Sequence, residues 1–225
     1  MIIVTGASKG IGLAIAERMS EKGFDVIGLS RNPGNLPFRS IECDVRSFDD
    51  IKRIATLLKS EGSQLTGLVN SAGVASMNLA LTTPPEVTST LLSTNLAGTI
   101  FCCQLFGPMM LNNGGGRIIN FSTIAVALGL RGESIYSASK AGVEAFSRSF
   151  AREMSGFRVT VNCIAPGPIQ TEMMRGITEE QIEKVIAQQV IRDKFTTSSV
   201  ADVVEILFDE RAASISGQVL RVGGV

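Results

Sequence analysis

Short apolar runs alternate with amphipathic segments along the whole chain. Runs rich in β-branched residues predict strands over residues 2–5, 25–30, 40–43, 66–70, 117–122, 158–164 and 218–222. Apolar positions that recur with a helical period predict helices over residues 11–22, 48–60, 86–111, 134–155, 178–191 and 198–208. Ser47 is a residue type that caps helices, and Pro33, Gly34 and Pro37 indicate a loop between the second and third strands.

Short, continuous apolar strands that are separated by helices are typical of a parallel sheet covered on both faces. The pattern therefore predicts an α/β protein with a doubly wound Rossmann fold and about seven parallel strands. No linker, low-complexity tract or internal repeat divides the sequence, so we expect one domain over residues 1–225.

Composition and charge exclude several kinds of chemistry. The 225 residues include 21 basic and 21 acidic side chains, which leaves no net charge to attract nucleic acid or an anionic membrane. There is no histidine, which excludes a Ser-His-Asp relay and a histidine-ligated metal, and we expect no metal site. Acid–base chemistry has to come from carboxylates, lysines, cysteines or the single tyrosine, Tyr136.

The cysteines and the apolar segments predict a cytoplasmic protein. Cys43, Cys102, Cys103 and Cys163 show no CxxC spacing and lie in apolar surroundings, as reduced cysteines in a core do. The chain starts with Met1 and a short strand, without the charged and apolar regions of a signal peptide. The longest weakly polar stretch, residues 118–130, is too short to span a bilayer.

Three glycines join the first predicted strand to the first predicted helix. The segment from Thr5 to Gly12 reads TGASKGIG, with a GxxxGxG spacing that differs from the common GxGxxG dinucleotide fingerprint. Glycines at such a turn let backbone N–H groups approach a pyrophosphate at the positive end of a helix. The alternative is an ordinary strand-to-helix turn, but its place at the first β-to-α turn favours phosphate binding.

Five motifs in a fixed order then resemble those of the short-chain dehydrogenases/reductases. They are TGxxxGIG at residues 5–12, an NSAG variant of the NNAG turn at 70–73, Asn95, YxxxK from Tyr136 to Lys140, and the segment from Asn162 to Thr171. The tail from Ser216 to Leu220 is similar to the last strand of that family. The resemblance covers nearly the whole chain and implies a nicotinamide-dependent oxidoreductase with that family's Rossmann fold.

The cofactor preference follows from the end of the second strand. Members that prefer NAD carry an acidic residue there, whereas this chain has Ser30 followed by Arg31. An arginine can form paired hydrogen bonds with a 2′-phosphate, and Lys9 adds a second positive charge, so we expect NADP(H) unless both are only solvated surface charges. The resemblance implies these cofactor-binding residues: Gly6, Ser8, Lys9, Gly10, Ile11, Gly12, Ser30, Arg31, Asp44, Val45, Asn70, Ala72, Gly73, Tyr136, Lys140, Pro166, Gly167, Ile169 and Thr171.

Tyr136 and Lys140 are the expected catalytic pair. Four residues apart on a helix, they face the same way, and a neighbouring ammonium together with the oxidised cofactor would lower the tyrosine pKa. The resemblance implies that Tyr136 protonates the substrate oxygen, that Lys140 holds the nicotinamide ribose, and that Asn95 anchors a water. The substrate-orienting serine of the family corresponds to Thr123, although its neighbour Ser122 is an alternative.

The resemblance is greatest to 3-oxoacyl-acyl-carrier-protein reductases, which implies a carbonyl or acyl-thioester substrate. We expect an apolar substrate mouth formed by Ala125, Leu128, Gly129, Met173, Met174 and Ile177. An acyl carrier protein is a candidate partner, but residues 112–116 carry no charge, and only Arg117, Arg152 and Arg158 are near the expected flank. A sugar, polyol or small-ketone reductase and an NADP(H)-sensing regulator without turnover stay open. Apolar residues on two faces of helices 86–111 and 134–155 predict a homodimer or homotetramer.

Overall fold

A seven-stranded parallel sheet forms the centre of the computed structural model, which describes residues 1–111, 113–174 and 176–225. The strand order is β3-β2-β1-β4-β5-β6-β7, which confirms the predicted doubly wound α/β fold. The strands are β1 (Ile2–Thr5), β2 (Val26–Ser30), β3 (Arg39–Glu42), β4 (Gly67–Asn70), β5 (Gly116–Phe121), β6 (Val159–Pro166) and β7 (Val219–Val222). Each lies within two residues of its predicted position.

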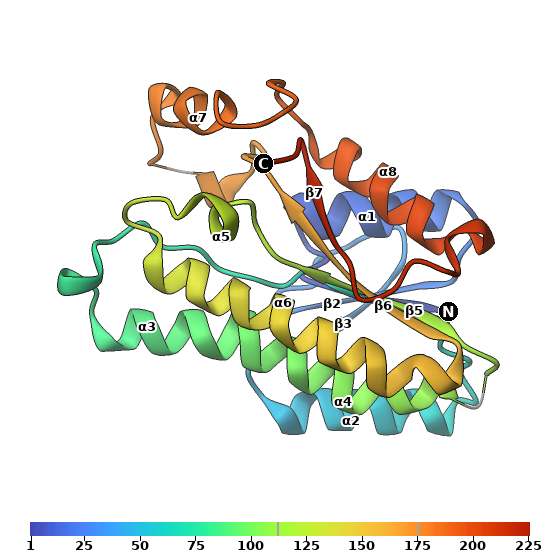
Figure 1. The fold of residues 1–225 in the computed structure, drawn as a ribbon. Helices are drawn as coiled ribbons and strands as arrows, with labels where there is room; N and C mark the ends of the chain where they lie inside the picture. The colour runs from blue at the N-terminus through green and yellow to red at the C-terminus, as the bar shows by residue number, and fades with distance from the viewer. Residues whose placement is uncertain (112, 175) are drawn as a thin grey trace.

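Helices cover both faces of the sheet (Figure 1). One face carries α1 (Gly10–Glu21) and α8 (Thr197–Phe208), and the other carries α2 (Phe48–Ser60), α4 (Gly98–Leu111) and α6 (Ser134–Met154). The local sequence explains α2 well, because the Ser47 hydroxyl accepts a hydrogen bond from the Asp50 N–H and caps the first turn. Its apolar positions, spaced at three and four residues, are buried against the sheet.

Shorter elements lie mainly at the carboxyl ends of the strands. They are η1 (Ala80–Thr82), α3 (Pro85–Leu91), the π-helix η2 (Leu92–Ala97), α5 (Ala125–Leu128), η3 (Ser155–Phe157), η4 (Glu172–Met174), α7 (Glu179–Ile186) and η5 (Glu210–Ala212). The continuous helix predicted over 86–111 is thus divided by a π-helical segment. The helix predicted over 178–191 ends at Ile186, because Val190 and Ile191 donate backbone hydrogen bonds to Gly224 and Gly223 instead.

The core consists of two apolar layers, one on each side of the sheet. Strands β1, β2, β4 and β6 are buried on both faces, apart from the half-buried last residue of β2, and this explains their uninterrupted apolar sequences. Within the described ranges, no helix is both long and apolar enough to cross a membrane.

The carboxyl edge of the sheet carries a row of polar residues across neighbouring strands. Thr5 of β1 is paired with Asn70 of β4, Asn70 with Asn120 of β5, and Asn120 with Cys163 of β6. The Asn70 amide donates to Asn120 Oδ1 at 2.8 Å, and the Asn120 amide donates to the Ser147 hydroxyl at 2.8 Å. This buried network ties β4, β5 and α6 together directly below the loops that follow the strands.

Candidate active site

The glycine loop lies at the edge of a cavity of about 800 Å³ at the carboxyl ends of the strands. Gly6 and Gly10 have φ angles of 68° and 60°, where a side chain is strained. A Cβ on Gly6 would also lie 2.9 Å from the Ala72 Cα, and a Cβ on Gly12 would overlap the Gly6 carbonyl oxygen. Helix α1 begins at Gly10, so its positive end faces the cavity, and the loop fits a pyrophosphate group.

Two arginines, Arg31 and Arg46, lie at the carboxyl ends of β2 and β3. Ser30, Arg31, Asp44 and Arg46 all line this part of the cavity. The Arg46 Nε donates to both Asp44 carboxylate oxygens at 3.0 Å and its Nη2 donates to one of them at 2.6 Å, and these bonds lower the pKa of Asp44. Arg31 has no ion pair among the described residues, so its guanidinium can bind an anion. Sequence reasoning missed Arg46.

The sequence suggested that Lys9 faces a 2′-phosphate, whereas in the structure Lys9 pairs with a carboxylate. Its ammonium lies 2.7 Å from the Glu172 carboxylate of η4, across the opening of the cavity. Both side chains are more than half exposed, so this ion pair contributes little stability and a phosphate can compete for Lys9. Thr171 lies beside Gly10, and together these contacts bring the segment after β6 against the glycine loop.

The turn after β4 divides its residues between the cavity and the core. Ala72 and Gly73 line the cavity, and the Ala72 N–H donates to the Thr5 hydroxyl at 3.0 Å. Asn70, in contrast, is 3% exposed and is not part of the lining, because its amide is hydrogen-bonded to Asn120 beneath the turn. Its position suits a residue that holds the turn in place, and a direct contact with the cofactor stays a prediction.

Tyr136 lies in the first turn of α6 and faces the cavity. Burial and the nearby carboxylate of Glu133 raise its pKa to about 12, although its hydrogen bond with Thr123 acts in the opposite direction. Burial is the largest of these causes and Lys140 is not among them. The lowering expected from Lys140 together with the oxidised cofactor stays a prediction. A phenol with this pKa is protonated at neutral pH and can donate a proton.

Lys140 lies one turn after Tyr136 and is 6% exposed. Its ammonium donates a hydrogen bond to the Phe121 carbonyl oxygen at 2.8 Å, which fixes the side chain between α6 and the end of β5. A Cβ on Gly73 would lie only 3.4 Å from this ammonium, so a glycine there leaves room for it. Burial lowers the pKa of Lys140 to about 8.

Thr123 and Ser122 point in opposite directions after the last residue of β5. The Ser122 hydroxyl donates to the buried Glu144 carboxylate at 2.7 Å, on the side of α6. The Thr123 hydroxyl instead accepts the Ala125 N–H at 3.2 Å and interacts with Tyr136 at the cavity. This geometry favours Thr123 as the residue that holds a substrate oxygen, because the hydroxyl of Ser122 is already bound to Glu144.

Asn95 is fully buried in the π-helix η2. Its side-chain oxygen accepts the Val74 N–H at 2.8 Å, and its amide donates to the Val74 carbonyl at 2.9 Å and to the Ser139 hydroxyl at 3.0 Å. Asn95 therefore joins the segment after β4 to helix α6. It does not line the cavity, although a Cβ on Gly73 would lie 3.3 Å from its side-chain oxygen.

The far end of the cavity is mostly apolar. Of the expected mouth residues, Ala125, Met174 and Ile177 line it, Leu128 and Gly129 do not, and the side chain of Met173 lies outside the described part of the structure. Sequence reasoning missed several lining residues: Val74, Met77, Leu130, Glu133, Ile182 and Val185. The chain brings them together from three separate segments, so no local spacing could reveal them.

The remaining predicted residues fall into two groups. Ser8, Ile11, Val45, Pro166, Gly167 and Ile169 all line the cavity, as the resemblance implies. Arg117, Arg152 and Arg158, considered as a flank for a carrier protein, lie at the amino ends of β5 and β6 and at the end of α6. Arg152 follows Tyr136 by sixteen residues, about 24 Å along a helix, so these arginines are remote from the cavity.

Comparisons with known proteins agree with this geometry. A family scan matches residues 6–224 to the family described as enoyl-(acyl carrier protein) reductase. The 3-oxoacyl-(acyl-carrier-protein) reductase FabG of Staphylococcus aureus strain Mu50 is 32% identical over 236 residues, which cover 99% of this chain and 96% of that protein. The chain belongs to the short-chain dehydrogenase/reductase family. As such it is an oxidoreductase that uses NAD(P)(H).

Other members of the family carry different names. The reductase MabA of Mycobacterium bovis, also described as a 3-oxoacyl-(acyl-carrier-protein) reductase, is 34% identical over 99% of this chain and 91% of its own length. The ligand-free structure of Thermoplasma acidophilum aldohexose dehydrogenase superimposes with a TM-score of 0.90 at 30% identity, covering 99% of this chain and 92% of that one. Relatives at similar distance thus act on unlike substrates.

Proposed function

We propose that this short-chain dehydrogenase/reductase is an NADP(H)-dependent carbonyl reductase that acts on a 3-oxoacyl thioester. The observation that carries the proposal is the placement of Tyr136, Thr123 and Lys140 around one end of the cavity, with the glycine loop at the other. In this arrangement a carbonyl substrate and a dinucleotide can lie side by side.

Each residue then has a role that follows from its surroundings. When bound, the cofactor supplies the hydride. Thr123 donates a hydrogen bond to the carbonyl oxygen, and Tyr136, protonated at neutral pH, transfers its proton to that oxygen. Lys140 holds the ribose hydroxyls and, as a cation beside the phenol, stabilises the phenolate that remains. Asn95 holds the loop that encloses this end of the cavity.

The choice of NADP(H) rests on the charges beside β2. No carboxylate ends that strand, and Arg31 is available to bind a 2′-phosphate, with Arg46 next to it. We expect Arg31→Asp to raise KM for NADPH at least tenfold and to leave KM for NADH equal or lower. Arg192→Asp, at an exposed arginine outside the cavity lining, is the matched control. Unchanged KM values in Arg31→Asp would contradict the NADP(H) proposal.

The apolar mouth supports an acyl substrate. Val74, Met77, Leu130, Met174 and Ile177 surround the space beyond Tyr136, and such a lining accommodates an alkyl chain better than a row of hydroxyls. The names of the FabG and MabA relatives point to the same substrate class. An acyl carrier protein stays a possible donor of the substrate, but the arginines considered for docking lie at the opposite end of the sheet.

One residue favours a second candidate, the oxidation or reduction of a sugar or polyol. Glu133 lies three residues before Tyr136, lines the cavity and is half-buried, and burial raises the pKa of its carboxyl. Its side chain accepts no hydrogen bond among the described residues, so hydroxyl groups of a substrate could supply the missing donors. The similarity to an aldohexose dehydrogenase agrees with this candidate.

The two candidates give different results with Glu133→Gln. If an acyl thioester is the substrate, the neutral glutamine keeps kcat/KM within about threefold of the wild type, because the carboxylate contacts no substrate donor. If a sugar is the substrate, loss of hydrogen bonds to a charged acceptor lowers kcat/KM about tenfold or more. Glu86→Gln, on an exposed position of α3, is the control. Acetoacetyl thioesters and a panel of aldohexoses are the substrates to compare.

Assembly and location are proposals as well. Phe101, Leu105, Phe146 and Phe150 on α4 and α6 are only half-buried, and we propose that this face pairs in a homodimer or homotetramer. Sedimentation that shows only monomer at micromolar concentration would contradict this. Four buried, unpaired cysteines suit the reducing cytoplasm.

A further inference from the structure

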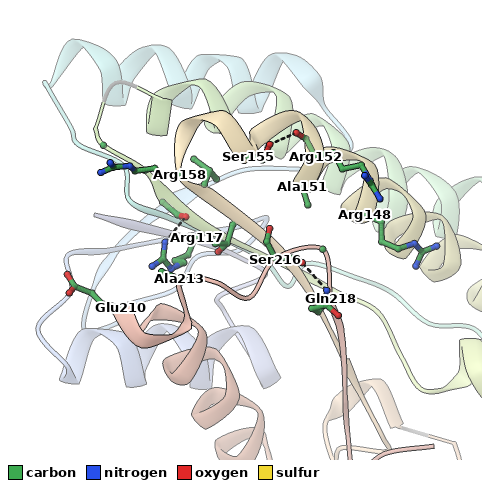
Figure 2. A pocket seen from close by; sticks show the side chains of 16 residues that line it. Arg117, Arg148, Ala151, Arg152, Ser155, Arg158, Glu210, Ala213, Ser216 and Gln218 are labelled. Carbon is green, nitrogen blue, oxygen red and sulfur yellow. Dashed lines mark hydrogen bonds between the residues drawn. The ribbon is translucent and has the colours of Figure 1, made fainter.

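A second cavity, of about 1080 Å³, opens at the end of the sheet opposite the candidate active site. It lies where β5, β6 and β7 begin, between the last turns of α6 and the short helix η5. Figure 2 shows Arg117 and Arg158 on one side and Arg148 and Arg152 on the other, with Ser216 and Gln218 between them. We call this cavity the arginine pocket.

The arginine pocket concentrates positive charge in a chain that has none overall. Four arginines line it against one acidic residue, Glu210. Arg148 lies 3.9 Å from the Glu144 carboxylate, whereas the other three arginines form no ion pair with any described residue. The net positive charge of the lining would attract an anion that enters the pocket.

One side chain at the arginine pocket has a buried donor that lacks a partner within the described ranges. The Arg117 Nε atom is buried and donates to no acceptor among the described residues, although its Nη1 donates to the Gly116 carbonyl at 3.2 Å. Arg158 has a φ of 58° and is the one described non-glycine residue with a positive φ. This left-handed conformation ends η3 and places Arg158 directly before β6.

The lining of the pocket limits the chemistry of its ligand. It contains no aromatic ring on which a nucleobase could stack, and its apolar members are small: Ala151, Val159 and Ala213. Hydroxyls, four guanidiniums, the Gln218 amide and the Glu210 carboxylate make up the polar side chains of the lining. Guanidiniums form paired hydrogen bonds with phosphate and carboxylate groups. Because the arginines lie on two sides, a ligand that satisfies them needs more than one charged group (Figure 2).

We propose that the arginine pocket binds a small multivalent oxyanion, a molecule with two or more phosphate or carboxylate groups. The pocket is separate from the cavity that contains Tyr136, and the two lie at opposite ends of β5 and β6. A ligand here does not contact the reacting atoms, so its binding can be measured whether or not the proposed reductase activity is correct.

The test is titration calorimetry of the full chain with tripolyphosphate, and separately with citrate, at low ionic strength. We expect at least one of the two probes to bind at one site in addition to any binding at the glycine loop. At a free probe concentration ten times Kd, we expect Tm to rise by about 4 °C. Affinity for tripolyphosphate alone identifies a phosphate ligand, and equal or greater affinity for citrate identifies a polycarboxylate. Either result supports the proposal.

Three variants locate the site. Arg152→Gln removes one guanidinium and is expected to weaken binding about tenfold. Arg158→Gly removes another, but glycine suits the φ of 58°, so weaker binding there cannot be explained by loss of folding. Arg192→Gln, outside both cavities, is expected to bind like the wild type. The glycine loop is intact in all three, so only the arginine pocket differs.

Two outcomes would overturn the proposal. In the first, the wild type and the Arg152→Gln and Arg158→Gly variants bind both probes with the same affinity, or none of them binds either probe. The other is a change of oligomeric state in these variants, seen by sedimentation, without a change in affinity for either probe. That second result would assign the arginines to a contact between copies of the chain.

Discussion

Lys140 carries a charge in a largely buried position, and replacing it tests that environment directly. Its side chain is 6% exposed, and burial lowers its pKa from 10.5 to about 8. In Lys140→Met, a side chain of similar length fills the same space without a titratable group. The folded protein therefore loses the cost of holding a desolvated ammonium at neutral pH.

The expected magnitude comes from the shift in pKa. A difference of 2.5 between the two values corresponds to about 3 kcal/mol at pH 7, because each pKa unit is worth about 1.4 kcal/mol. Between pH 8 and 10.5 the unfolded chain binds more protons than the folded chain. The free energy of unfolding of the wild type therefore rises with pH in this window. The cost of the buried ammonium is fully present below about pH 8 and disappears as pH rises to 10.5.

The assay is urea unfolding of wild type and Lys140→Met at pH 7 and pH 9. The variant's advantage in free energy of unfolding is expected to shrink by about 1 kcal/mol between these values. The hydrogen bond to the Phe121 carbonyl is lost at both pH values and shifts the difference only by a constant. Burial raises the pKa of all four cysteines, but these are present in both proteins, so their contribution cancels.

Lys184→Met is the matched control, because Lys184 is 70% exposed. The difference in free energy of unfolding between Lys184→Met and the wild type is expected to be the same at pH 7 and pH 9. If the difference for Lys140→Met is also the same at both pH values, the reasoning is refuted, because the Lys140 ammonium is then solvated in the folded protein.

Three further substitutions test the geometry around the cavity. Thr123→Val is expected to lower kcat/KM about 100-fold through loss of a hydrogen bond in the transition state, with only a small fall in Tm from the lost Ala125 N–H bond; activity close to wild type would exclude Thr123 as the substrate-orienting residue. Ser122→Ala is expected to lower the free energy of unfolding by about 2 kcal/mol, measured in urea, because the buried Glu144 carboxylate loses its donor. Gly12→Ala is expected to weaken cofactor binding at least tenfold in a fluorescence titration, whereas Gly156→Ala, where a Cβ meets no atom within 4 Å, leaves it unchanged; equal binding by both would contradict the role of the glycine loop.

The sequence was sufficient to predict the fold because the central strands are buried. Uninterrupted apolar runs such as residues 2–5 and 67–70 have only one stable location, the interior of a parallel sheet, and the glycine loop marks the first turn of that sheet. The helix over 178–191 was predicted too long because its last turn is replaced by hydrogen bonds to Gly223 and Gly224, which are distant in sequence.

The site was less predictable where side chains depend on distant partners. Periodicity could not decide between Ser122 and Thr123, because the answer lies in the buried Glu144 on α6. Nor could local patterns identify Glu133 and Arg46, whose importance arises from burial and from a contact across a turn. Asn70 resembles a cofactor-binding residue in sequence, yet its partner on the neighbouring strand holds it in the core.

The central claim is that Tyr136 is the proton donor of a carbonyl reductase, and one comparison tests it most directly. Wild type and Tyr136→Phe are compared for oxidation of NADPH with an acetoacetyl thioester and for formation of NADPH with aldohexoses, alongside cofactor affinity by fluorescence. The wild type is expected to turn over one of these substrates, and Tyr136→Phe to do so about 1,000-fold more slowly with unchanged cofactor affinity. Retained turnover in Tyr136→Phe, or tight NADPH binding by a wild type that turns over neither substrate class, would contradict the claim.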